Sequence, residues 1–141
     1  MERYRILPHP ADGKFRAFGA TLEDAFANAA LAEVSFMWDW QSVRAADSHS
    51  VEVRGRDREQ LLYKFLEEIL YLFETKNFLL AEVADLRITE DGGHFRLNAV
   101  FRGDEAGGRY EIFGEVKAVT YHEMKIEHGC EGWAAQAVVD L

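Results

Sequence analysis

The sequence contains little cysteine and proline and no long apolar run. Cys130 is the only thiol in 141 residues, so an intrachain disulfide and a cysteine-based zinc site are both excluded. No apolar run approaches the roughly 18 residues that a membrane span needs. The chain also enters strand-like sequence at Tyr4 without the apolar region of a secretory signal. We therefore expect a cytoplasmic protein that is not embedded in a membrane.

Positive charge is also scarce in this chain. The 16 Lys and Arg residues stand against 25 Asp and Glu residues, which gives a formal net charge of −9. Binding to a phosphate backbone depends on clustered Lys and Arg residues that release counterions. We therefore expect no strong direct binding to nucleic acid, and any nucleic acid would be reached through a partner protein.

The common nucleotide-binding and hydrolase motifs are absent. The chain has no G-x-x-x-x-G-K-[ST], no G-x-G-x-x-G after a strand, no H-E-x-x-H and no G-x-S-x-G. Its five histidines lack the spacing of a metal-binding motif, and we retain His9 and His122 as candidates among them. Carboxylates are the remaining groups that could carry chemistry.

Hydrophobic periodicity predicts an α+β protein. A helix is expected from the N-cap Thr21 to about Trp38, and a second helix from the N-cap Asp57 to about Thr75. Alternating apolar residues predict strands over residues 4–7, 50–55, 79–89, 95–101, 110–121, 124–126 and 133–139. We expect a single domain over residues 1–141, in which two helices pack on a mainly antiparallel or mixed β-sheet.

Three aspartates stand out by their settings. Asp12 follows two prolines, which should place it on a stiff loop between two strands. Asp39 closes the first predicted helix between two tryptophans, and Asp140 follows an apolar run as the penultimate residue. Any one acid in such an acidic chain could simply belong to a solvated face. Because ligand sets made only of oxygen select hard cations, we hypothesise that the three aspartates meet at one Ca²⁺ or Mg²⁺ site.

Several segments, in the same order along the chain, resemble the archease family. The matching segments are residues 9–12, 15–19, 21–26, 61–66, 71–73, 115–122 and 138–141. The resemblance covers nearly the full chain, and residues 116–122 are its most specific part.

The resemblance implies a small accessory protein that is not an enzyme. Such a protein binds a divalent cation and activates an RNA ligase of the tRNA-splicing or RNA-repair type by promoting its guanylylation and repeated turnover. Matched residue by residue, it implies that Asp12, Asp39 and Asp140 are the cation ligands.

The sequence departs from the family pattern around the first aspartate. Pro10 stands in place of the usual threonine, and Gly13 and Lys14 stand where an apolar residue and then glycine are common. The charge of Lys14 could weaken cation binding, or it could be directed at the partner.

Two other functions remain open at this point. The first is a metal-dependent hydrolase that uses the same aspartates, with His9 or His122 as general base. The second is a general chaperone for nucleic-acid-modifying enzymes, which would require a large exposed apolar patch.

Lys117 lies in the most family-like segment and has two possible roles. It could balance Glu115 at the surface, or it could support the acidic site or contact the ligase. If Val116 and Ala118 face the core, the period of two in a strand places Lys117 and Val119 on the opposite face.

Overall fold

The computed structural model describes residues 2–141 and confirms the predicted order of elements. The elements are β1 (Tyr4–Leu7), β2 (Asp12–Gly19), α1 (Leu22–Val34), the short 3₁₀ helix η1 (Trp40–Ser42), β3 (Asp47–Gly55), α2 (Arg58–Lys76), β4 (Phe78–Asp91), β5 (His94–Glu105), β6 (Ala118–Gly129) and β7 (Gly132–Asp140). The α+β class is therefore confirmed.

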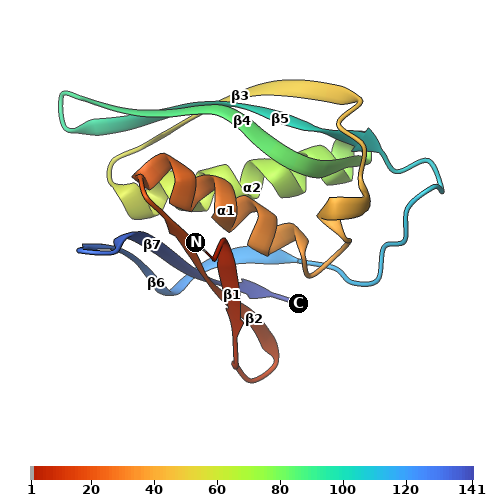
Figure 1. Ribbon diagram of the computed structural model, residues 1–141, viewed down its shortest axis with the longest axis horizontal. Coiled ribbons are helices and arrows are strands. Elements are labelled where there is room, and N and C mark those ends of the chain that lie inside the picture. The colour runs from red at the N-terminus through yellow and green to blue at the C-terminus, as the bar shows by residue number, and fades with distance from the viewer. Residues whose placement is uncertain (1) are drawn as a thin grey trace.

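The strands divide into two antiparallel sheets, and the helices lie between them (Figure 1). One sheet has the order β1-β2-β7-β6 and the other has the order β3-β5-β4. Helix α1 packs against β2 and β7 on one side and β4 on the other, while α2 packs against β6 and β3. A helix between two sheets must bury two faces, which explains why α2 has apolar residues on more than one face. Among the described residues, no helix is both long and apolar enough to cross a membrane.

Both predicted N-caps are confirmed. The Thr21 side chain accepts a hydrogen bond from the backbone N–H of Asp24 at 3.1 Å. The Asp57 carboxylate accepts one from the N–H of Gln60 at 2.7 Å. These bonds satisfy N–H groups that have no partner within the helix, so the starts of α1 and α2 are set by local sequence. Helix α2 ends at Lys76 and is capped by Asn77, which adopts the left-handed conformation with φ of 53°.

Helix α1 ends at Val34, earlier than the predicted end near Trp38. The chain leaves the helix so that two tryptophans can reach opposite sheets. The indole N–H of Trp38 donates to the carbonyl of Leu80 in β4 at 3.0 Å, and that of Trp40 donates to the hydroxyl of Tyr4 in β1 at 3.0 Å. The bulky residues in this segment therefore connect the two sheets.

The prediction of one long strand over residues 110–121 is wrong, because residues 106–117 are irregular and β6 begins at Ala118. The Tyr110 hydroxyl donates to the carboxylate of Asp104 at 2.7 Å, and this bond is the largest cause that lowers the pKa of Asp104. Further along, a Cβ on Gly114 would lie 2.2 Å from the carbonyl oxygen of Phe36. This segment therefore packs on the connection after α1 and does not pair as a strand.

Glu33 of α1 places its carboxyl group in the protein interior. Its exposure is 0%, and neither carboxyl oxygen has a hydrogen-bond partner within residues 2–141. Burial raises the pKa of Glu33 well above its ordinary value of 4.5, because the charged form would lose its hydration. Folding therefore favours the protonated form of this side chain.

We predict that Glu33→Leu stabilises the protein, and more so at alkaline pH. The unfolded chain releases the Glu33 proton near the ordinary pKa, whereas the folded chain retains it. The free energy of unfolding of the wild type should therefore be highest below the ordinary pKa of Glu33 and fall as the pH rises toward the folded pKa. Removing the unpaired group should add about 1–3 kcal/mol to the free energy of unfolding near pH 8. The gain should be smaller near about pH 5.

Urea denaturation of the wild type, Glu33→Leu and Glu33→Gln at both pH values measures this effect. The Gln variant keeps a polar group but cannot ionise, so its stability should vary less with pH than that of the wild type. An identical pH dependence in all three proteins would contradict the prediction.

Candidate functional site

The pairing of β2 with β7 places Asp12 beside Asp140. The two residues are direct partners in the antiparallel register, and residues opposite each other in such a pair share one face, with Cβ atoms about 4.5–5.5 Å apart. Asp12 is the first residue of β2 and does not lie on the loop where the sequence placed it. Two of the three predicted aspartates, far apart in sequence, are therefore neighbours.

Asp39 is the N-cap of η1 and does not close α1 as predicted. It is exposed, and its Oδ1 accepts a hydrogen bond from the N–H of Gln41 at 3.0 Å. The segment that carries it packs against β2, since a Cβ on Gly13 would lie 2.8 Å from the ring of Phe36. Asp39 therefore follows a segment that touches the residue next to Asp12, and its meeting with the other two aspartates stays a prediction.

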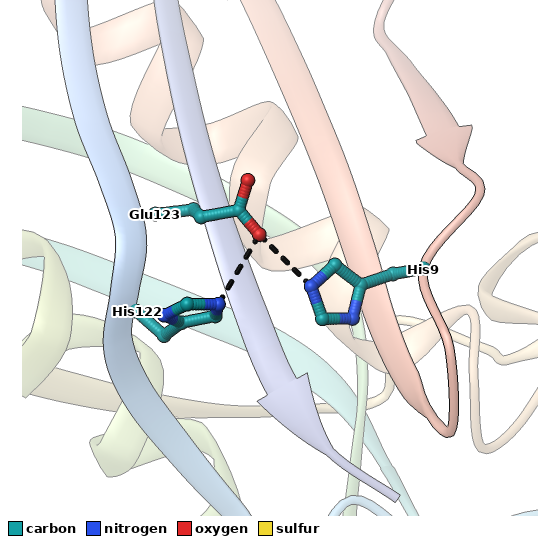
Figure 2. Close-up of side chains that lie close together, drawn as sticks. All are labelled: His9, His122 and Glu123. Carbon is teal, nitrogen blue, oxygen red and sulfur yellow. Dashed lines mark hydrogen bonds and ion pairs between the residues drawn. The ribbon is translucent and has the colours of Figure 1, made fainter.

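A second group of potential ligands lies beside the aspartate pair. Glu123 Oε2 lies 2.9 Å from His9 Nε2 and 3.3 Å from His122 Nε2, so both imidazole rings converge on one carboxylate oxygen (Figure 2). The potential ligand atoms of these three side chains all lie within 4.8 Å of one another. Within residues 2–141, it is the one group of at least three potential metal ligands that lie this close together. It contains none of the predicted aspartates.

An irregularity in β6 brings Glu123 to this position. The register of β6 against β7 shifts between Thr120 and Lys125, and Glu123 adopts a φ of 53°. The side-chain amide of Gln136 donates to the backbone carbonyl of Glu123 at 2.9 Å, which holds the irregular segment against β7. Sequence reasoning missed Glu123, and its only signal there was its position directly after the family-like residues 116–122.

Lys14 pairs with Glu123 and is not free to face the predicted cation. Its Nζ donates to Glu123 Oε1 at 3.1 Å. This bond is the largest cause that holds the pKa of Glu123 below its ordinary value, followed by the bond from His9. On the other side of the imidazole ring, His9 Nδ1 lies 3.6 Å from Asp12 Oδ2. His9 therefore lies between Asp12 and Glu123 and connects the aspartate pair to β6.

The backbone of Lys117 contacts the site, while its side chain belongs to another surface. Its N–H donates to the carbonyl of Asp140 at 2.8 Å. The residue is exposed and borders a surface depression together with Glu67 and Glu68 of α2. The predicted placement of Val119 on the Lys117 face is wrong, because Val116 and Val119 are both buried and β6 begins only after Lys117.

The aspartate pair is suited to a hard divalent cation. Two carboxylates directly opposite each other on neighbouring strands repel. The contact from Asp12 to His9 Nδ1, at 3.6 Å, is longer than a hydrogen bond. Carboxylate oxygens are the ligands that Ca²⁺ and Mg²⁺ prefer, and a bound cation would relieve the repulsion. Asp12 and Asp140 therefore fit the hard cation site that the sequence predicts.

Comparison with known proteins gives matches along the whole chain. The sequence model of the Archease protein family (MTH1598/TM1083) matches residues 4–141. A protein archease from Pyrobaculum neutrophilum is 39% identical over 140 residues, which cover 98% of this chain and 95% of that protein. A protein archease from Thermococcus gammatolerans is also 39% identical, with 100% of both chains covered. The solution structure of protein 1598 from Methanobacterium thermoautotrophicum has a TM-score of 0.86 at 34% identity, again with 100% of both chains covered.

We predict that Asp140→Asn removes the stabilising effect of Ca²⁺ or Mg²⁺. Without metal, the variant should be as stable as the wild type or more stable by about 0.2–1 kcal/mol, because a like-charge pair has been removed. With metal, the melting temperature of the wild type should rise, since a ligand that binds only the folded state stabilises it.

Melting curves with and without millimolar Ca²⁺ or Mg²⁺ measure both effects. Asp47→Asn is the matched control, because Asp47 is an exposed acid at the start of β3 in the other sheet. An equal metal-dependent rise in both variants would show that the cation binds elsewhere.

Proposed function

Because the chain belongs to the archease family, we propose that it is a non-enzymatic accessory protein of an RNA ligase. In this proposal it promotes guanylylation and repeated turnover of a ligase of the tRNA-splicing or RNA-repair type, in the cytoplasm. The observation that supports the proposal most is the register that pairs Asp12 with Asp140. It brings together two acids from opposite ends of the chain that lie in family-like segments.

The charge of the chain suits such a partner. An enzyme that binds RNA presents Lys and Arg residues to the phosphate backbone. A protein with a formal net charge of −9 is attracted to such a surface and competes poorly for RNA itself. Recruitment to the ligase therefore requires no nucleic acid contact by this chain.

The acidic pair would form the working part of the contact. Asp12 and Asp140 would hold the divalent cation, with Asp39 as the third predicted ligand. When bound, the cation supplies a fixed positive charge that can orient groups of the partner. Two exposed apolar side chains near these aspartates could contact the ligase. Leu141 directly follows Asp140. Phe113 is held near Asp39, because its backbone N–H donates to the carbonyl of Met37.

The two alternative functions differ in their structural support. A metal-dependent hydrolase needs a base near the aspartates, and His9 Nδ1 lies 3.6 Å from Asp12. The Nε2 atom of that ring is already hydrogen-bonded to Glu123, which limits its use as a base. A general chaperone needs a contiguous apolar face, whereas the large exposed apolar side chains come from five parts of the chain, with Ile112 and Phe113 as the one adjacent pair. These exposed side chains are Ile6, Tyr71, Ile112, Phe113, Tyr121 and Leu141.

We predict that Asp12→Asn and Asp140→Asn each reduce ligase activation by at least about tenfold, because each removes a cation ligand. The assay is RNA ligation under multiple-turnover conditions, with ligase guanylylation measured in parallel. Asp47→Asn should activate like the wild type. The proposal fails if stoichiometric wild-type protein leaves ligase guanylylation unchanged. Hydrolysis of a phosphoester by the protein alone, lost in Asp12→Asn, would favour the hydrolase instead.

We also predict that Lys117→Ala reduces activation while the melting temperature stays nearly constant. The side chain is exposed and forms no ion pair within 4.0 Å in the described part of the chain, so its loss should cost little stability. Lys125→Ala is the control, since Lys125 is an exposed lysine of β6 that lies 3.7 Å from Glu127. Equal activation by both variants at limiting concentration would assign Lys117 to the solvated surface.

A further inference from the structure

We propose that His9, His122 and Glu123 form a second cation site that takes a borderline transition-metal ion of the Zn²⁺ class. This site is chemically different from the aspartate pair. Two imidazole nitrogens and one carboxylate oxygen favour Zn²⁺, Co²⁺, Ni²⁺ or Cu²⁺, whereas ligand sets made only of oxygen favour Ca²⁺ and Mg²⁺. The proposal concerns metal binding by the protein itself and does not depend on a ligase partner.

The two separations from Glu123 Oε2 are already close to the spacing that such an ion requires, and all three ligand atoms lie within 4.8 Å of one another. Zinc binds imidazole nitrogen and carboxylate oxygen at about 2.0–2.2 Å in a tetrahedral arrangement, so ligand atoms lie roughly 3.3 Å apart. Here Glu123 Oε2 lies 2.9 Å from His9 Nε2 and 3.3 Å from His122 Nε2. The two imidazole rings lie nearly edge to face at 74°, with their centroids 5.7 Å apart. Each ring directs a nitrogen at the Glu123 carboxylate (Figure 2). Small movements of side chains would complete the site.

The surroundings of the other His9 nitrogen, Nδ1, also suit a histidine that binds a metal through Nε2. His9 Nδ1 is buried, makes no hydrogen bond within residues 2–141, and lies 3.6 Å from Asp12 Oδ2. A neutral imidazole can donate from only one nitrogen, yet carboxylates lie at both ends of this ring. With an ion at Nε2, the proton would lie on Nδ1 and face Asp12. A metal-binding histidine that donates its other N–H to a carboxylate is a recurrent arrangement in proteins.

The surrounding residues hold Glu123 in place for this role. Lys14 bonds to Oε1 at 3.1 Å and leaves Oε2 to the two imidazoles. The left-handed backbone of Glu123, with φ of 53°, is uncommon for a residue other than glycine and is held by Gln136. Strain of this kind persists only where the surroundings stabilise it, and it is common at functional sites. The carboxylate is therefore positioned before any ion binds.

The site is open on one side. The His122 side chain is 66% exposed, whereas that of His9 is 16% exposed. Three protein ligands leave the fourth position of a tetrahedral ion for water or for a donor from another molecule. Asp12 would be a positioning residue here, because it acts through His9, while it remains a direct ligand in the aspartate pair.

Zn²⁺ titration of the full-length protein by calorimetry tests the proposal, in millimolar Mg²⁺ so that the hard cation site is saturated. We expect one Zn²⁺ per chain. Asp12→Asn should weaken Zn²⁺ binding by about 10–100-fold, as the loss of an outer partner does. His9→Ala and His122→Ala each remove a ligand and should weaken it further. His94→Ala, an exposed histidine at the start of β5, should bind like the wild type.

Co²⁺ in place of Zn²⁺ gives a spectroscopic readout that a merely structural role would not change. The wild type and His94→Ala should develop the intense visible absorption of tetrahedral Co²⁺, and His122→Ala should not. Circular dichroism of each metal-free variant verifies folding. Because the His122 side chain is largely exposed, its replacement should disturb folding least. Unchanged Zn²⁺ affinity in His122→Ala would overturn the proposal. Loss of Zn²⁺ binding in Asp140→Asn would assign the ion to the aspartate pair instead, and would also overturn it.

Discussion

The antiparallel pairing of β2 with β7 is the constraint on which the candidate site depends. It joins the beginning of the chain to its end, with Asp12 opposite Asp140 and Gly19 opposite Trp133. Because side chains alternate between faces, a shift of one residue in this register would move every buried residue of β2 to the outer face. The core packing of Phe15 therefore also determines the position of the acidic pair.

Two residues with positive φ, Ala11 and Glu123, lie at the contact between His9 and β6. Ala11 has a φ of 62° directly before β2, and Glu123 has a φ of 53° within β6. Both conformations are unfavourable for residues other than glycine. The first turns the chain from the His9 segment into β2, and the second brings a carboxylate across β7 toward Lys14. Local strain is thus concentrated where the charged groups meet, in a sheet that is otherwise regularly paired.

The helices and the segments after them connect this sheet to the second one. Trp38 bonds to β4 and Trp40 bonds to β1, so Asp39 lies between contacts to both sheets. The irregular residues 106–117 close over the same connection through Phe113 and Gly114. The segment of Asp39 is therefore anchored to both sheets.

Local signals in the sequence were enough to predict the helix starts and the regularly alternating strands. The N-caps Thr21 and Asp57 and the alternation in residues 95–101 were sufficient for the α+β class, because capping bonds and side-chain periodicity depend only on near neighbours. The family-like segments led to the prediction of Asp12 and Asp140 as cation ligands, and the register shows that the two residues are neighbours. Three features could be seen only in the folded chain: the strands form two sheets, residues 110–117 do not pair, and Glu123 lies against His9 and Lys14. Each of these results from contacts between distant residues, and in β6 also from a register shift that period-two patterning cannot represent.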